Sequence, residues 1–390
     1  NLKDLSDPFN SMDYTDSLGV RRYGYYGAYA DNPYWTASAF DNRNRYDRVL
    51  GQTTLGYRFG SHVTLSNRFG GEVMSDRISL QTPKLNTIAF EEEFYQASPK
   101  IYNGGYFEST DNISSYFNDL MLNLNYQIDK LGINAVLGHS VSSNRSNYLS
   151  SDIDPTTNGL VIENYYNFDN AVSKIRSQNY LTRSRKVGAY ATVNFDIDKF
   201  FFLELTGRND WSSTLAAANR SYFYPSVSAS WLFSQHFDEA TKKIMNYGKL
   251  RANVSSVGKD ASAFQNNDPG YIATEVESGF GSNIFPFNDV PGFSYQNRIG
   301  NNGLKPERQV GKELGVDLAF FGDRISLDFS VYQDKTRDQI VAVSTPSSTG
   351  FRSRIINAGT IENRGFEAGL RLVPIKRKGL RSPPPPPPPR

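Results

Sequence analysis

The side chains best suited to acid–base or metal chemistry are few and poorly spaced. The three histidines, His62, His139 and His236, are far apart, have no ligand spacing and fall near expected turns or strand ends. The 390 residues include no cysteine, which excludes thiolate metal sites and cysteine nucleophiles. The sequence also contains no glycine-rich phosphate loop, Gly-x-Ser-x-Gly turn or His-Glu-x-x-His motif. We therefore expect no catalytic residue, no metal, no cofactor and no enzyme activity.

Two acidic groups need separate consideration. Glu91, Glu92 and Glu93 are consecutive, and Asp152 lies two residues before Asp154. Carboxylates of this kind can hold a hard cation through oxygen ligands. Both groups occur in polar, loop-like sequence, so we interpret them as solvated loop acids.

Aromatic residues in the expected loops are better candidates for binding. Aromatic faces can stack on sugar rings or peptide side chains with little entropy to lose. The alternative is a girdle of aromatic residues at a membrane interface, and the sequence does not separate the two. The candidates are Tyr25, Tyr26, Tyr34, Trp35, Tyr165 and Tyr166.

The elements that must position these residues are β-strands. Apolar and polar residues alternate in segments joined in pairs by short turns, a pattern that only extended strands produce. In the second pair, Leu120, Leu122 and Leu124 alternate with Asn123 and Asn125 before a turn at 129–130. Similar pairs turn at 60–61, 198–199 and 322–323. A longer connector near 238–245, for which a helix is one interpretation, joins another pair.

Long polar stretches separate these pairs, at roughly residues 81–115, 144–182, 258–310 and 334–360. Such loops are unusual in compact soluble domains. They are expected in an outer-membrane barrel, where short turns connect the strands on the periplasmic side and long loops connect them on the extracellular side. We predict an all-β fold, an antiparallel transmembrane barrel segment of about 11–12 strands. A soluble β-sandwich or solenoid remains the alternative.

Composition supports the membrane interpretation. Aromatic residues make up 14% of the chain, whereas hydrophobic residues make up only 38%, which suits strands with one lipid face and one polar face. A mean hydropathy of -0.52 excludes a helical membrane protein. The net charge of +2 gives no reason to expect nucleic-acid binding.

On this alternation, the polar face of the barrel wall would carry charges that line the lumen. Such charges tune passage through barrels. The candidates are Arg58, Arg68, Glu72, Glu204 and Arg208.

Several sequence words resemble the SusC/RagA-type TonB-dependent transporters of the outer membrane. They are Asn-Pro-Tyr-Trp (32–35), Leu-Glu-Leu-Thr-Gly-Arg-Asn-Asp-Trp-Ser-Ser (203–213), Tyr-Pro-Ser-Val-Ser-Ala-Ser-Trp (224–231), Leu-Arg-Ala-Asn-Val-Ser-Ser-Val-Gly (250–258), Gly-Leu-Lys-Pro-Glu (303–307) and Asn-Arg-Gly-Phe-Glu (363–367). Their order and spacing match the middle and later barrel of that family, over roughly residues 30–375.

The resemblance implies a plugged barrel of about 22 strands, energised through TonB, with a SusD-like surface lipoprotein outside. It implies import of a large nutrient, an oligosaccharide or peptide, across the outer membrane. The alternative is a non-transport barrel, an adhesin or a glycan-binding surface protein. We expect residues 1–380 to be a barrel fragment, with the plug and final strands missing, and residues 381–390 to be a disordered or artefactual polyproline tail.

Overall fold

The computed structural model describes residues 40–86, 101–156, 158–266 and 290–374, together with residue 37 and the short segments 14–15, 21–22, 271–272, 275–278 and 281–284. The predictions for Tyr25, Tyr26, Tyr34 and Trp35 lie outside the described residues, as do those for Glu91, Glu92, Glu93 and the polyproline tail.

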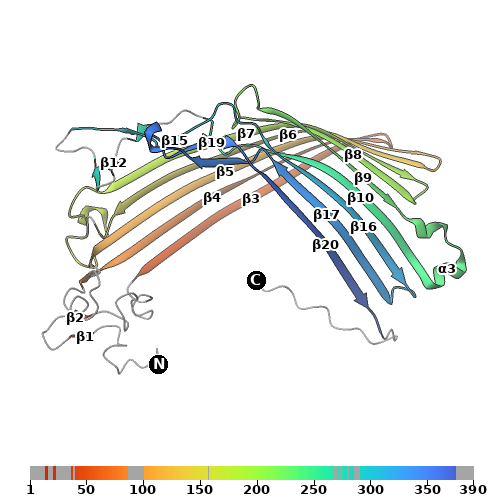
Figure 1. Ribbon diagram of the computed structural model, residues 1–390, viewed down its shortest axis with the longest axis horizontal. Coiled ribbons are helices and arrows are strands. Elements are labelled where there is room, and N and C mark those ends of the chain that lie inside the picture. Colours follow the sequence, from red (N-terminus) through yellow and green to blue (C-terminus); the bar gives the residue numbers. More distant parts are fainter. Residues whose placement is uncertain are drawn as a thin grey trace. The chain divides into compact units, whose positions relative to one another are not determined.

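The main element is an antiparallel sheet of eleven strands, in the order β20-β17-β16-β10-β9-β8-β7-β6-β5-β4-β3 (Figure 1). The strands are β3 (Asp41–Phe59), β4 (Val63–Asn86), β5 (Ile101–Ile128), β6 (Leu131–Ile153), β7 (Arg176–Ile197), β8 (Phe201–Ser212), β9 (Ser221–Trp231), β10 (Met245–Lys259), β16 (Glu307–Phe320), β17 (Ile325–Arg337) and β20 (Thr360–Leu372). The all-β prediction and the strand count are confirmed. The sheet has two edge strands, β3 and β20, and is not closed.

Short elements connect or accompany this sheet. They are β1 (Tyr14–Thr15), β2 (Arg21–Arg22), η1 (Phe168–Asn170), η2 (Phe233–His236), α3 (Glu239–Ile244), β11 (Tyr271–Ile272), β12 (Glu275–Ser278), β13 (Gly281–Ile284), β14 (Ser294–Tyr295), β15 (Arg298–Ile299), β18 (Ile340–Ser344), η3 (Ser347–Thr349) and β19 (Ser353–Asn357). The expected helical connector is α3, and the carboxylate of Asp238 caps it by accepting a hydrogen bond from Thr241 N–H.

The connections alternate in length as predicted, apart from the brief link between β8 and β9 (213–220). The turns at 60–62, 129–130, 198–200 and 321–324 are short, and positive φ angles at Gly60, Asp129 and Gly322 allow the tight reversal. The connections after β6, β10 and β17 are long.

The predicted loop boundaries were wrong in the first half of the sheet. β5 already begins at Ile101, β6 continues to Ile153 and β7 begins at Arg176. In these extensions, for example Ser142 to Ser151, both faces of the strand carry polar residues, so the alternation that marks a strand is lost. The strand itself continues through these extensions, although the alternation of apolar and polar residues is lost.

The sheet has an apolar face and a polar face. On each face, residues that pair across neighbouring strands form rows that run from strand to strand. One apolar row comprises Phe195, Leu203, Ala229, Ala252, Leu314, Val331 and Phe366. The polar row beside it comprises Asn194, Glu204, Ser228, Asn253, Glu313, Tyr332 and Gly365. The apolar side chains are largely exposed, among them Phe366 at 73%, so a soluble two-layer sandwich is not formed by the described residues.

The chain divides into two compact units. The first comprises Asn1–Gln52, Gly70–Tyr116 and Ser143–Arg183, and the second comprises Thr53–Phe69, Phe117–Ser142 and Ser184–Arg390. The second unit has a buried apolar cluster formed by residues of β9, of the link between β8 and β9 and of the long connections: Leu215, Tyr222, Ala261, Leu304 and Ile355. We call these five residues the loop core.

Candidate functional site on the polar face

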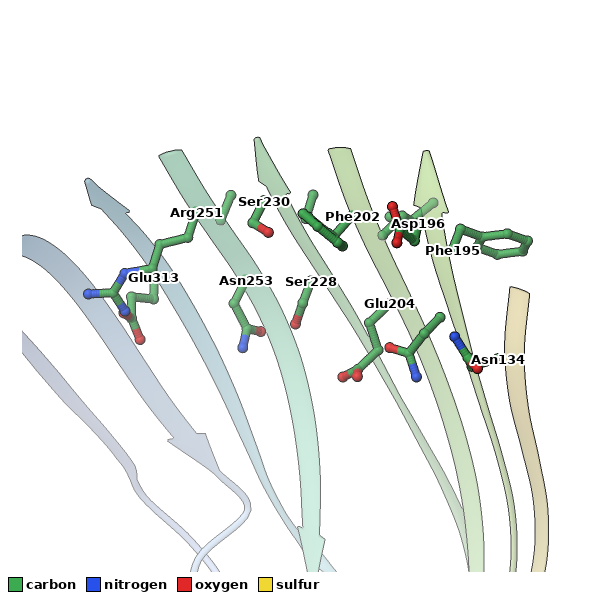
Figure 2. Close-up of a pocket in the computed structure, with 14 residues that line it drawn as sticks. Asn134, Phe195, Asp196, Phe202, Glu204, Ser228, Ser230, Arg251, Asn253 and Glu313 are labelled. Atoms are coloured by element: carbon green, nitrogen blue, oxygen red, sulfur yellow. The ribbon is translucent and has the colours of Figure 1, made fainter. Parts of the chain in front are cut away.

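A cavity of about 480 Å³ lies on the polar face of the sheet (Figure 2). The residues that line it come from β6 to β10 and β16 and all belong to the second unit. Its polar lining includes Asn134, Asn194, Glu204, Ser228 and Asn253. These side chains come from successive strands because directly paired residues project to the same face of a sheet. Phe202, which is 38% exposed, adds an aromatic ring.

On the loop side of this cavity lies a band of paired charges and rings. The Arg208 guanidinium donates to Asp210 Oδ1 at 2.8 Å and to Ser140 Oγ at 2.8 Å, and its carbon lies 5.4 Å from the Tyr190 ring centroid. Tyr224 donates its hydroxyl to Asp210 Oδ2. Since Asp210 is buried and fully paired, this band is a rigid part of the wall.

Tyr190 fits this band because residue 138 is glycine. A Cβ at Gly138 would overlap the Tyr190 ring. Glycine therefore lets the ring lie flat across β6, where it meets the Arg208 guanidinium.

On the turn side of the cavity, Arg251 of β10 joins three carboxylates. Its guanidinium lies 2.6 Å from Glu313 Oε1, 3.6 Å from Asp317 Oδ1 and 3.2 Å from Asp328 Oδ2. Gly315 leaves room for it, since a Cβ there would crowd Arg251 Nε. Arg251 thus links β10, β16 and β17 on their polar face.

The five predicted lumen charges differ in their surroundings. Arg68 pairs with Asp119 at 2.7 Å, Glu72 pairs with Arg48 at 2.7 Å, and Arg208 belongs to the band described above. Glu204 lines the cavity. In the described part of the chain, Glu204 and Arg58 have no hydrogen-bonding or ionic partner.

Of the predicted loop aromatics, the structure describes Tyr165 and Tyr166. Tyr165 is exposed, whereas Tyr166 lies beside Tyr106, with ring centroids 6.2 Å apart. Asn170 organises their loop, because its side chain accepts from Ile162 N and donates to the carbonyls of Ile162 and Tyr165. The two tyrosines are therefore adjacent in sequence but do not form one platform.

Asp154 has a local structural role. Its Oδ1 accepts from the backbone N–H and hydroxyl of Thr156, and its Oδ2 lies 3.5 Å from Arg176. Among the described residues, no group of three or more histidines and carboxylates is arranged to hold a metal ion. His62, His139 and His236 are exposed. His139 lies inside β6, so the expectation that it falls near a turn or strand end was wrong.

One of the sequence words that suggested the family contributes to the loop core. Leu304 and Lys305 belong to the Gly-Leu-Lys-Pro-Glu word: Leu304 is fully buried, and the Lys305 N–H and C=O both bond the side chain of Asn357. Glu307 accepts from Ile340 N–H at 2.9 Å. This word therefore anchors the long connection before β16 to the segments around Ile340 and Asn357.

A second polar anchor holds the same region. Asp260 accepts from Ser212 Oγ at 2.5 Å and from Lys186 Nζ at 3.0 Å. This anchor was not predicted from the sequence. The aspartate that follows the Leu250–Gly258 word is the only local signal, and its partners are 48 and 74 residues away.

Comparison with known proteins supports the interpretation of this sheet. Residues 2–377 match the family described as TonB dependent receptor-like, beta-barrel. The chain belongs to this family. It is accordingly an outer-membrane β-barrel sequence, which confirms the predicted family and location.

Curated relatives and solved structures agree. TonB-dependent receptors P3 and P26 of Formosa agariphila are 27% and 24% identical over 52% and 54% of this chain, which covers only 20% and 21% of their lengths. The RagAB peptide transporter has the same fold, with a TM-score of 0.70 and 18% identity over 93% of this chain and 39% of that chain. The RagAB peptide importer in its closed-closed state gives a TM-score of 0.72 at 18% identity, covering 95% of this chain and 40% of that chain.

Among the described helices, none has the length and apolar character needed to cross a bilayer. In this family the strands cross it, with the apolar face toward lipid and the polar face toward the lumen.

Proposed function

We propose that this chain is the barrel part of an active importer of a large nutrient, an oligosaccharide or a peptide. The observation that carries the proposal is the polar wall. Paired charges lie on either side of an open cavity, while the opposite face is mainly apolar. A wall of this kind lines a lumen through which a polar solute can pass without covalent chemistry.

The proposal includes partners outside this chain. We propose a SusD-like lipoprotein at the long connections and TonB acting through an N-terminal region, as the resemblance implies. The RagAB structures are described as those of a peptide transporter, and relatives named TonB-dependent receptors support energised transport. We further propose that residues 1–380 form a barrel fragment and that residues 381–390 are a tail outside it.

Uptake by intact cells tests this function. The gene for the full-length protein is deleted and restored in its natural host, and uptake of fluorescent oligosaccharides and peptides is measured with and without functional TonB. We expect uptake that needs both the gene and TonB. Uptake that persists without TonB would indicate a passive pore, and loss of cell adhesion with normal uptake would indicate an adhesin.

A further inference from the structure

A second cavity, of about 460 Å³, lies on the apolar face of the sheet near its short turns. Ala229 of β9 and Ala252 of β10 are paired in register and line it. In the next row toward the turns, Trp231 pairs with both Phe201 and Leu250. The hollow exists because the two alanines are much smaller than these three residues. We call this cavity the outer groove.

The connector between β9 and β10 closes the turn-side end of the outer groove. Leu232 N–H donates to the Phe200 carbonyl at 2.7 Å, and the rings of Phe200 and His236 meet edge to face at 4.5 Å. Both of these rings line the groove. Phe233 folds back over β10, where a Cβ at Gly248 would lie 2.4 Å from its ring. The groove therefore has a closed end that is fixed to the backbone.

The outer groove stays open in a complete barrel. It lies on β8, β9 and β10, which have β7 and β16 as further neighbours, so strands added at β3 or β20 would not cover it. It is on the face that points to lipid, whereas a plug would fill the opposite, lumen side. An empty hollow between apolar groups loses dispersion contacts. An acyl chain is therefore the occupant that its surroundings supply.

The position of the groove along the strands corresponds to the border between hydrocarbon and headgroups. Phe201 is the first residue of β8 and Trp231 is the last of β9, and tryptophan is enriched at this depth. A phospholipid here has its chain beside the strands and its phosphate beside the turn and the connector. His236, which is exposed, can donate a ring N–H to an oxygen of that phosphate.

Charge on the same segments favours an anionic headgroup. Lys199 directly precedes Phe200, and Lys243 lies in the last turn of α3. Neither lysine has an ionic partner among the described residues. Their long stems let an ammonium group reach a phosphate at the interface. The carboxylates nearby are engaged: Asp198 by Lys130, Glu239 by Lys242, and Asp238 by the N-terminus of α3.

We propose that the outer groove binds an anionic phospholipid of the periplasmic leaflet. One acyl chain lies along Ala229 and Ala252, and the phosphate lies beside His236 and Lys199. A zwitterionic lipid shares the chain and the phosphate, but the lysines would repel its ammonium group. The site is independent of the imported solute because it uses only the outer face of the barrel.

Native mass spectrometry of the full-length transporter tests the site. Delipidated protein in mild detergent is titrated with dioleoylphosphatidylglycerol and, as the zwitterionic probe, with dioleoylphosphatidylethanolamine. We expect a saturable phosphatidylglycerol adduct that binds about tenfold more tightly than phosphatidylethanolamine, the effect of one favourable charge contact. Inorganic phosphate at the same concentration should not displace it, because the chain supplies part of the affinity.

Two variants separate the chain from the headgroup. Ala252→Phe fills the hollow, and we expect the Kd of both lipids to rise about tenfold. Ala368→Phe is its matched control, because it adds the same ring to the apolar face of β20, outside the groove. Lys199→Gln should raise the Kd of phosphatidylglycerol about fivefold and leave that of phosphatidylethanolamine unchanged.

Lys312→Gln is the control for charge, since Lys312 pairs with Val254 on the same face but nearer the long connections. We expect both controls to stay within about twofold of wild type. Heat-modifiable migration verifies that each variant is folded.

Three results would overturn the site. One is wild-type lipid binding in folded Ala252→Phe, and another is displacement of the lipid by inorganic phosphate, which would indicate an anion site without a chain. The third is an unchanged preference for phosphatidylglycerol in both Lys199→Gln and His236→Gln, which would show that the headgroup does not lie at the turn and the connector.

Discussion

The side-chain amides of Asn67 on β4 and Asn118 on β5 bond to each other twice. Asn67 Nδ2 donates to Asn118 Oδ1 at 3.2 Å, and Asn118 Nδ2 donates to Asn67 Oδ1 at 3.1 Å. By strand alternation the pair shares the apolar face with Leu65 and Leu120. Two amides on a lipid-facing surface can be tolerated when each satisfies the other.

We expect Asn67→Leu to destabilise the folded barrel by about 1–3 kcal/mol, because it leaves the Asn118 amide unpaired among apolar groups. The double variant Asn67→Leu, Asn118→Leu should recover most of that loss. Denaturant unfolding of the full-length protein in liposomes measures both. A double variant as unstable as the single one would show that the apolar face is not in lipid here.

Gly138 should tolerate no side chain. Gly138→Ala forces the Tyr190 ring off β6 and away from Arg208, and we expect a loss of about 1–3 kcal/mol in unfolding free energy. Gly56→Ala is the control, because the nearest atoms to its new Cβ would be at 3.9 Å. Comparable losses in the two variants would mean that strand propensity, and not the ring contact, determines the effect.

Acid should loosen the outer connections through Asp260. Burial alone raises the pKa of this carboxyl, but hydrogen bonds from Ser212 and Lys186 and the charge of Lys186 outweigh it, so the pKa is lowered. A lowered folded pKa contributes stability that is present above the unfolded pKa of about 3.9 and is lost as pH falls toward the folded value.

We therefore expect protease resistance of the connections to fall as the pH drops below about 4, and the Asp260→Asn variant to lack this dependence. Lys186→Met should raise the pKa of Asp260 and shift the loss to higher pH. Limited proteolysis with an acid-tolerant protease across this range provides the measurement. An unchanged pH profile in Asp260→Asn would assign the acid sensitivity to other groups.

The two faces should respond differently to charge. Val193→Lys places a cation on the apolar face and should cost about 2–4 kcal/mol at the bilayer midplane, whereas Asn194→Lys, on the polar face, should be nearly neutral. Unfolding in liposomes compares them directly. Equal costs would refute the assignment of the apolar face to lipid.

The long and short connections should lie on opposite sides of the membrane. A cysteine at the exposed Tyr165 should react with a membrane-impermeant maleimide on intact cells, and a cysteine at Asp129 should not. Both positions should react after the cells are lysed. Labelling at position 129 of intact cells would reverse the topology.

The sequence was sufficient for the fold because the two-residue period appears wherever one face is apolar. Leu120, Leu122 and Leu124 mark β5 without further information. Where both faces are polar, as at the end of β6, periodicity carries no signal and the strand was predicted too short.

The site was only partly predictable. Glu204 was expected on the polar wall, but its neighbours Ser228 and Asn253 depend on register across β8, β9 and β10. The partners of Arg251 are likewise at least 62 residues away. Alternation tells which face a residue takes, but it does not tell which residues on that face become neighbours.

Within the described residues, β3 and β20 are the two edge strands of this sheet. Each has one side of its backbone ladder paired inside the sheet and the other side available to a complementary strand. A separately expressed second piece of the barrel would therefore join residues 1–374 by pairing with β3 and with β20. Such a split transporter would report membrane assembly in living cells, because transport would return only when both edge strands are paired with the second piece.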